Sequence, residues 1–121
     1  MSPMTRILSV TALASIALAG QAFAHAHLKS SVPADKAAVA SPSELDLTFT
    51  EELNLKFSGL TVTGPDKKDI KLGDGMLEDG GKVLMVPVSD KLAPGSYMVD
   101  WHVLSTDGHK TNGSFSFTVN P

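Results

Sequence analysis

Apolar and polar residues alternate along most of the chain that follows residue 25. The alternation is clearest at 45–49, 60–62, 97–103 and 115–119, where every second residue is Leu, Val, Phe, Tyr or Trp. Successive side chains of a strand point to opposite faces, so this period of two predicts strands with one buried face. Residues 28–32 are expected to enter a first strand. The pattern therefore predicts a mainly β-structured protein.

Short segments rich in Gly, Pro, Asp and Asn separate these strands. They lie at 64–66, 73–75, 79–81, 93–95 and 112–113. Frequent turns between short strands are typical of two antiparallel sheets packed face to face. Residues 83–88 are more continuously apolar, and Pro87 predicts that this strand lies at a sheet edge or a bulge. Only residues 50–56 are expected to form a helical turn.

The first 24 residues follow a different pattern. A charged start, an apolar stretch at 7–19 and small residues around Ala24 match a secretory signal peptide with its cleavage site. The apolar stretch is shorter than the roughly 20 residues that a membrane-spanning helix needs. We expect residues 1–24 to be removed as a signal peptide, which leaves residues 25–121 as one soluble domain. A cut after Ala26 is the alternative, and either cut leaves a histidine first.

The charge of the chain and its lack of cysteine limit the functions to consider. There are 10 basic and 13 acidic residues, and loss of the leader with the single arginine, Arg6, leaves a net charge of about −4. A domain with this charge is not expected to bind nucleic acid or an anionic membrane. Without cysteine, it forms no disulfide and binds a metal only through nitrogen, oxygen or thioether donors.

Histidine would be the first residue of the processed chain if cleavage follows Ala24. His25 then offers two nitrogen donors, its new α-amine and its imidazole. Asp107 and His109 are two positions apart, so in an extended segment their side chains point to the same side. The set of three nitrogens and one carboxylate oxygen suits Cu(II) better than Ca²⁺ or Mg²⁺. We therefore predict one Cu(II) site per mature chain, formed by His25, Asp107 and His109.

Other polar residues are candidates for auxiliary roles or for none. His27 is the third residue of the predicted mature chain. A chain with histidine in third place can also bind Cu(II) through its terminal amine, two backbone amides and the imidazole of that histidine. In that geometry Asp107 and His109 would not be ligands. A solvent-facing strand position is an equally good explanation of His27. Glu51 follows a predicted strand, and it is either an outer acceptor that orients the terminal amine or a solvated loop residue. His102 is interpreted as an exposed surface residue.

At these residues the chain resembles the CopC family of periplasmic copper-resistance proteins. The resemblance rests on a leader that ends at His25 and on the segments 28–34, 49–53, 95–101 and 105–109. It implies a small Greek-key β-sandwich of about seven strands, immunoglobulin-like or cupredoxin-like. It also implies Cu(II) ligands at His25, Asp107 and His109, with Glu51 at the family's glutamate. A role in periplasmic copper homeostasis or resistance, with an inner-membrane copper permease as partner, is implied as well.

The chain departs from the pattern of this family in its methionines. Many members hold Cu(I) in a methionine-rich loop, whereas residues 63–69 contain no methionine here. Met76, Met85 and Met98 are scattered, and core filling is the ordinary role of Met85 and Met98 in strands. Because soft Cu(I) prefers sulfur donors, no dedicated Cu(I) site is expected.

Three functions are compatible with these observations. The first, which we favour, is a monomeric, non-catalytic Cu(II)-binding protein that sequesters or delivers copper in the periplasm. The second is a histidine-brace copper monooxygenase acting on polysaccharide. The chain is short for that class, and Tyr97 and Trp101 are predicted to face the core rather than a substrate. The third is an adhesion module with incidental histidines, which leaves the histidine after the leader unexplained.

Overall fold

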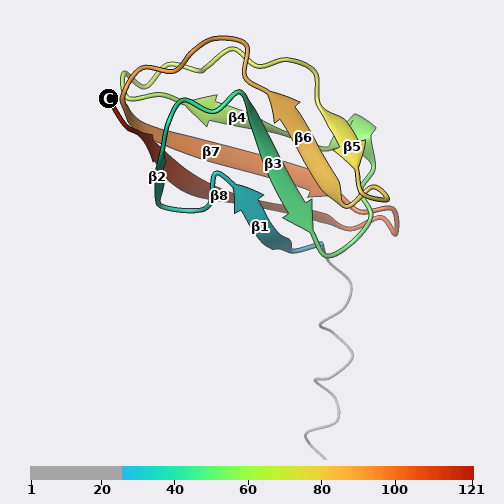
Figure 1. Cartoon of the computed structure of the whole chain (residues 1–121). Helices are drawn as coiled ribbons and strands as arrows, with labels where there is room; N and C mark the ends of the chain where they lie inside the picture. The colour runs from blue at the N-terminus through green and yellow to red at the C-terminus, as the bar shows by residue number, and fades with distance from the viewer. Residues whose placement is uncertain (1–25) are drawn as a thin grey trace, which may run out of the picture.

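Two four-stranded β-sheets packed face to face make up residues 26–121, the part of the chain that the computed structural model describes (Figure 1). The first sheet has the order β1-β3-β6-β5 and the second has the order β2-β8-β7-β4. The strands are β1 (Leu28–Val32), β2 (Ala37–Val39), β3 (Glu44–Phe49), β4 (Gly59–Thr63), β5 (Met76–Glu78), β6 (Val83–Pro87), β7 (Gly95–Leu104) and β8 (Lys110–Val119). Neighbouring strands are antiparallel except β2 and β8, which are parallel. The predicted all-β sandwich is confirmed, with eight strands in this range where about seven were expected.

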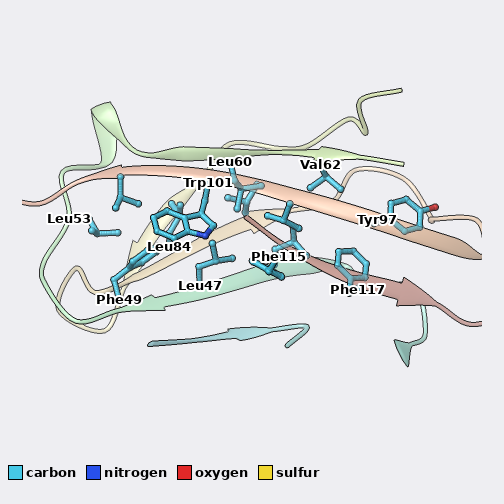
Figure 2. Packing of buried hydrophobic residues seen from close by; sticks show 14 of the residues in the cluster. Leu47, Phe49, Leu53, Leu60, Val62, Leu84, Tyr97, Trp101, Phe115 and Phe117 are labelled. Atoms are coloured by element: carbon cyan, nitrogen blue, oxygen red, sulfur yellow. The ribbon is translucent and has the colours of Figure 1, made fainter. Parts of the chain in front are cut away.

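The hydrophobic core lies between the two sheets and contains the residues that the alternating pattern marks as buried (Figure 2). The rings of Phe49 and Trp101 pack edge to face across the sheets, with their centroids 5.1 Å apart. Tyr97 and Phe117 stack with their centroids 5.4 Å apart. The Tyr97 hydroxyl donates a hydrogen bond of 2.6 Å to the Ala93 carbonyl, which satisfies the polar end of this buried side chain. Full burial of one such apolar side chain stabilises the fold by about 1.5–3 kcal/mol.

Two of the sequence expectations about local structure are wrong. Pro87 does not mark an edge strand, because β6 lies between β3 and β5. Pro87 is the last residue of β6, so its missing N–H removes no hydrogen bond from the interior of the strand. Asn112 and Gly113 do not form a turn, since both lie within β8. A Cβ on Gly113 would come within 2.6 Å of the Trp101 ring, so this glycine makes room for the indole.

Three segments that are distant in the sequence meet at one end of the sandwich. The Thr106 N–H donates to the Glu52 carbonyl at 3.0 Å, which joins the β7–β8 loop to the residues after β3. The Thr50 N–H donates to the His27 carbonyl at 3.0 Å, which joins the residues before β1 to the same place. We call this region, formed by residues 26–27, 50–54 and 105–109, the hairpin end.

The helical turn expected at residues 50–56 is only partly present. The structure has a short 3-10 turn, η2 (Leu55–Phe57), which begins near the end of that range and ends one residue beyond it, and residues 50–54 are not helical. The Asn54 side chain caps η2 by accepting a hydrogen bond of 3.1 Å from the Lys56 N–H. Within residues 26–121 there is no helix of a length and apolar character that would cross a membrane.

Candidate metal centre

The Asp-Gly-His motif lies in the five-residue loop 105–109 that joins β7 to β8. Leu104 and Lys110 form the last pair of the hairpin. Across the loop, the Ser105 N–H donates to the His109 carbonyl, and the Gly108 N–H donates to the Ser105 carbonyl, both at 2.9 Å. Gly108 has a φ of 97°, a left-handed conformation that glycine adopts without a Cβ clash. Hydrogen bonds and this glycine therefore fix the loop conformation.

The side chains of Asp107 and His109 contact each other within this loop. His109 Nδ1 lies 3.2 Å from Asp107 Oδ1, and the His109 backbone N–H donates to the same oxygen at 3.3 Å. The Ser105 hydroxyl also donates to Asp107 Oδ1. The His109 and Asp107 side chains are 46% and 47% exposed, so an ion can reach both from solvent. The predicted juxtaposition of Asp107 and His109 is confirmed.

These hydrogen bonds keep the Asp107 carboxylate ionised. The hydrogen bond from Ser105 is the largest cause that lowers the pKa of Asp107 below its ordinary value, and the hydrogen bond from His109 follows. Sequence reasoning gave Ser105 no role of its own, although it is buried and orients this carboxylate. The sequence does contain a sign that Ser105 is buried. It lies two residues after Val103, where the alternation of β7 requires a side chain that faces the core.

The residues before β1 are fixed against the same hairpin. Ala26 is 1% exposed, and its carbonyl accepts a hydrogen bond of 2.9 Å from the Thr111 hydroxyl on β8. The His27 N–H donates to the Thr50 hydroxyl at 2.9 Å. Thr111 is only two residues beyond His109. The backbone that leads into β1 therefore runs beside the loop that carries Asp107 and His109.

The structure brings together some of the predicted site residues and not others. His25 lies outside the described residues. Within 26–121, no group of three or more His, Cys, Asp or Glu side chains is arranged to hold a metal ion, so neither His27 nor Glu51 joins Asp107 and His109 in such a group. His27 is exposed, and Glu51 is half-buried directly after β3. His102 is exposed on β7, as interpreted from the sequence.

The methionines of strands β6 and β7 are not core residues, contrary to the sequence interpretation. Met98 is 44% exposed, and Met85 is half-buried outside the core cluster. Both occupy the outward positions of their strands, because their neighbours Val99, Leu84 and Val86 face the core. Their thioethers are therefore on the outer faces of the sandwich.

Known proteins resemble this chain in sequence and in fold. The model of the CopC domain family matches residues 28–120. The chain is 48% identical to protein YobA of Escherichia coli K12, with 80% of each chain covered. It is 39% identical to copper resistance protein C of Escherichia coli, with 84% of this chain and 86% of the relative covered. The crystal structure of PcoC, a methionine-rich copper resistance protein from Escherichia coli, aligns with a TM-score of 0.72 and 35% identity, covering 80% of this chain and 100% of PcoC. The chain therefore belongs to the CopC family.

Proposed function

We propose that this protein is an exported, non-catalytic Cu(II) carrier that binds one ion per processed chain and sequesters or delivers copper in the periplasm. Residues 1–24 are its signal peptide. The ligands are the α-amine and imidazole of His25, the carboxylate of Asp107 and the imidazole of His109. Several of its relatives are named copper resistance proteins, and these names support copper as the cargo.

The observation that carries this proposal is the attachment of Ala26 to β8. The Ala26 carbonyl is held by the Thr111 hydroxyl at 2.9 Å, two residues beyond His109. Consecutive Cα atoms are about 3.8 Å apart, so residue 25 is joined to the chain one peptide unit from this fixed point. This attachment supports His25 as a ligand together with Asp107 and His109. No other histidine of the chain would gain a free amine by cleavage after Ala24.

The backbone contacts at the hairpin end argue against the rival copper geometry, in which a terminus wraps the metal with the His27 imidazole. That geometry requires deprotonated amides at residues 26 and 27. The His27 amide N–H instead donates to the Thr50 hydroxyl at 2.9 Å. Ala26 is packed in the core, so wrapping would also extract a buried residue. The same packing supports cleavage after Ala24, since a cut after Ala26 would remove that residue.

The residues at the site account for uptake and release of the ion. Asp107 stays ionised at neutral pH because its pKa is lowered, and its contact with His109 Nδ1 orients the imidazole ring. Binding must displace protons from the amine and the imidazoles. Acid therefore releases copper. Glu51 is an auxiliary residue in this proposal, an outer acceptor for the terminal amine, and an inner-membrane copper permease is the expected protein partner.

A competition titration of Cu(II) against a chelator of known affinity tests the proposal. The protein that begins at His25 is compared with the same protein carrying one extra glycine before His25, which moves the amine away from its imidazole. Loss of a chelating ligand should weaken Cu(II) binding by at least about 100-fold, since even outer-sphere partners are worth about 10–100-fold. Cu(II) should also displace Zn(II). Equal affinity in the extended protein, or equal binding of Zn(II), would contradict the proposal.

The polysaccharide monooxygenase alternative gains no support from the surface. Such an enzyme needs exposed aromatic rings for a flat substrate, but Tyr97 and Trp101 are buried in the core. Phe57 is the one exposed aromatic side chain within residues 26–121. We therefore expect no oxidised oligosaccharides when the copper-loaded, reduced protein is incubated with chitin or cellulose.

A further inference from the structure

Two methionines lie directly opposite each other on the outer face of the first sheet. Met76 of the edge strand β5 pairs with Met85 of β6. Met76 is 46% exposed and Met85 is half-buried, while the adjacent Leu77 and Leu84 contact or form the core. Side chains directly opposite in an antiparallel pair have Cβ atoms about 4.5–5.5 Å apart. Two flexible thioethers at this separation can contact one ion without any movement of the backbone.

The same row of the sheet continues to a carboxylate. Asp46 of β3 lies directly opposite Met85, on the side away from Met76. Its Oδ1 atom is inaccessible to solvent and has no hydrogen-bond partner in the part of the chain that the structure describes, although the Asp46 side chain also interacts with the neighbouring Glu44 carboxyl. A covered carboxylate oxygen without a donor is costly and rare in folded proteins. A cation bound beside it would supply the missing interaction.

The surroundings of this row favour a positive ligand. Glu44 lies two residues before Asp46 on the same face of β3, and Glu78 lies two residues after Met76 on β5. Within residues 26–121, no lysine or histidine forms an ion pair with Asp46, Glu44 or Glu78. The negative charge on this face is therefore not neutralised by the protein itself.

We propose that Met76, Met85 and Asp46 form a second metal site, specific for a soft monovalent cation such as Cu(I) or Ag(I). Two thioethers supply the soft donors that such ions prefer over hard cations. The carboxylate balances the charge of the ion. This site is separate from the His25, Asp107 and His109 set, because its donors come from the other sheet, and it does not depend on the function proposed above. It departs from the expectation of no dedicated Cu(I) site, which rested on the lack of methionine in residues 63–69, on the scatter of the other methionines and on a core role for Met85.

The chain contains a matched control for this proposal. Met98 is 44% exposed, close to the 46% of Met76, but it lies on β7 of the second sheet. Its partners across the neighbouring strands are Thr63 and Ser116, so no second thioether stands beside it. Met98 therefore tests whether exposure of a methionine alone is enough to bind the ion.

Titration of the protein with Ag(I), followed through the methyl signals of ¹³C-labelled methionine, tests the proposal. We expect the signals of Met76 and Met85 to shift together and to saturate at one equivalent, while that of Met98 stays in place. Met76→Leu and Met85→Leu should each weaken Ag(I) binding at least about tenfold, because loss of a direct ligand should cost no less than loss of an outer-sphere partner. Met98→Leu should bind as the unchanged protein does.

His109→Ala separates this site from the proposed Cu(II) site. The Met76 and Met85 shifts should persist in that variant even if its Cu(II) binding is lost. Loss of the methyl shifts in His109→Ala, or a Met98 shift equal to the other two, would overturn the proposal. Because the methyl signals are measured on the unsubstituted protein, the test stands even if a leucine variant folds poorly.

Discussion

The two metal sites proposed here hold their donors in different ways. At the hairpin end, three hydrogen-bond donors converge on Asp107 Oδ1, and they fix both the carboxylate and the His109 ring. On the outer face of the first sheet, strand register alone places Met76 and Met85 opposite each other. Nitrogen and oxygen donors need such directional support, whereas flexible thioethers adapt to an ion. The first site should therefore be sensitive to its surroundings, and the second mainly to the loss of a donor.

Removal of one imidazole should produce the largest effect. His109→Ala should weaken Cu(II) binding by at least about 100-fold, because a direct nitrogen donor is lost and the Asp107 carboxylate loses its oriented neighbour. The measurement is the chelator competition described above. His102→Ala is the matched control. His102 is also a histidine of this hairpin, but it is exposed on β7, two residues before the last pair, Leu104 and Lys110. An equal loss in both variants would show that the β7–β8 loop is not the copper site.

Acid should release copper over the range in which the nitrogens are protonated. Asp107 has a lowered pKa, so its carboxylate is ionised throughout this range. Protonation of Asp107 therefore does not contribute to the pH dependence of Cu(II) affinity. Protons compete with Cu(II) for the amine and the imidazoles, so Cu(II) affinity should fall roughly tenfold or more for each pH unit below 7. Titrations at pH 8, 7 and 6 measure this slope. A flat profile would mean that oxygen donors alone bind the ion.

Ser105→Ala should weaken the site without removing a ligand. Loss of the hydroxyl removes the largest cause of the lowered Asp107 pKa, so that pKa should rise, as measured by carboxyl ¹³C NMR. Cu(II) affinity should fall about tenfold, because the Asp107 carboxylate loses the hydroxyl that orients it. Thr106→Ala is the control, because the structure uses the backbone N–H of Thr106 in its contact with Glu52. If the two variants bind copper equally well, the orientation of Asp107 does not matter.

The sequence predicted the fold well where its signal was local. Alternation identified the inward faces of β3, β7 and β8 because each long strand has one face on a single core. It failed at Gly113, where an Asn-Gly pair typical of a turn lies inside β8. The reason is the Trp101 ring, which needs the space of the missing Cβ, and this contact across two strands has no local signature.

The sequence also predicted that Asp107 and His109 lie together, but it assumed an extended segment. The structure instead brings the two side chains together in a tight loop, with Gly108 at a φ of 97° between them. The sequence did not reveal the pairing of Met76 with Met85. These residues are separated by a hairpin loop, and their opposition depends on the register of β5 against β6. Strand register is set by which face is buried, so it becomes visible only when the sheets are assembled.

A substitution next to the methionine site should have the smallest effect. The pKa of Glu44 is raised above its ordinary value, first by a hydrogen bond with the Asp46 side chain and then by the charge of Asp46. A raised carboxyl pKa means that the folded state binds the proton more tightly than the unfolded state, so stability falls as pH rises through the ordinary pKa to the raised one. Glu44→Gln should therefore give a small increase in Tm at pH 7 that disappears near pH 3, where both proteins are neutral at this position. Glu52→Gln, at an exposed glutamate after β3, is the control.

Ag(I) bound beside Asp46 would offset the same repulsion, so the Tm difference at pH 7 should shrink in its presence. A difference that Ag(I) leaves unchanged would place the ion away from Asp46.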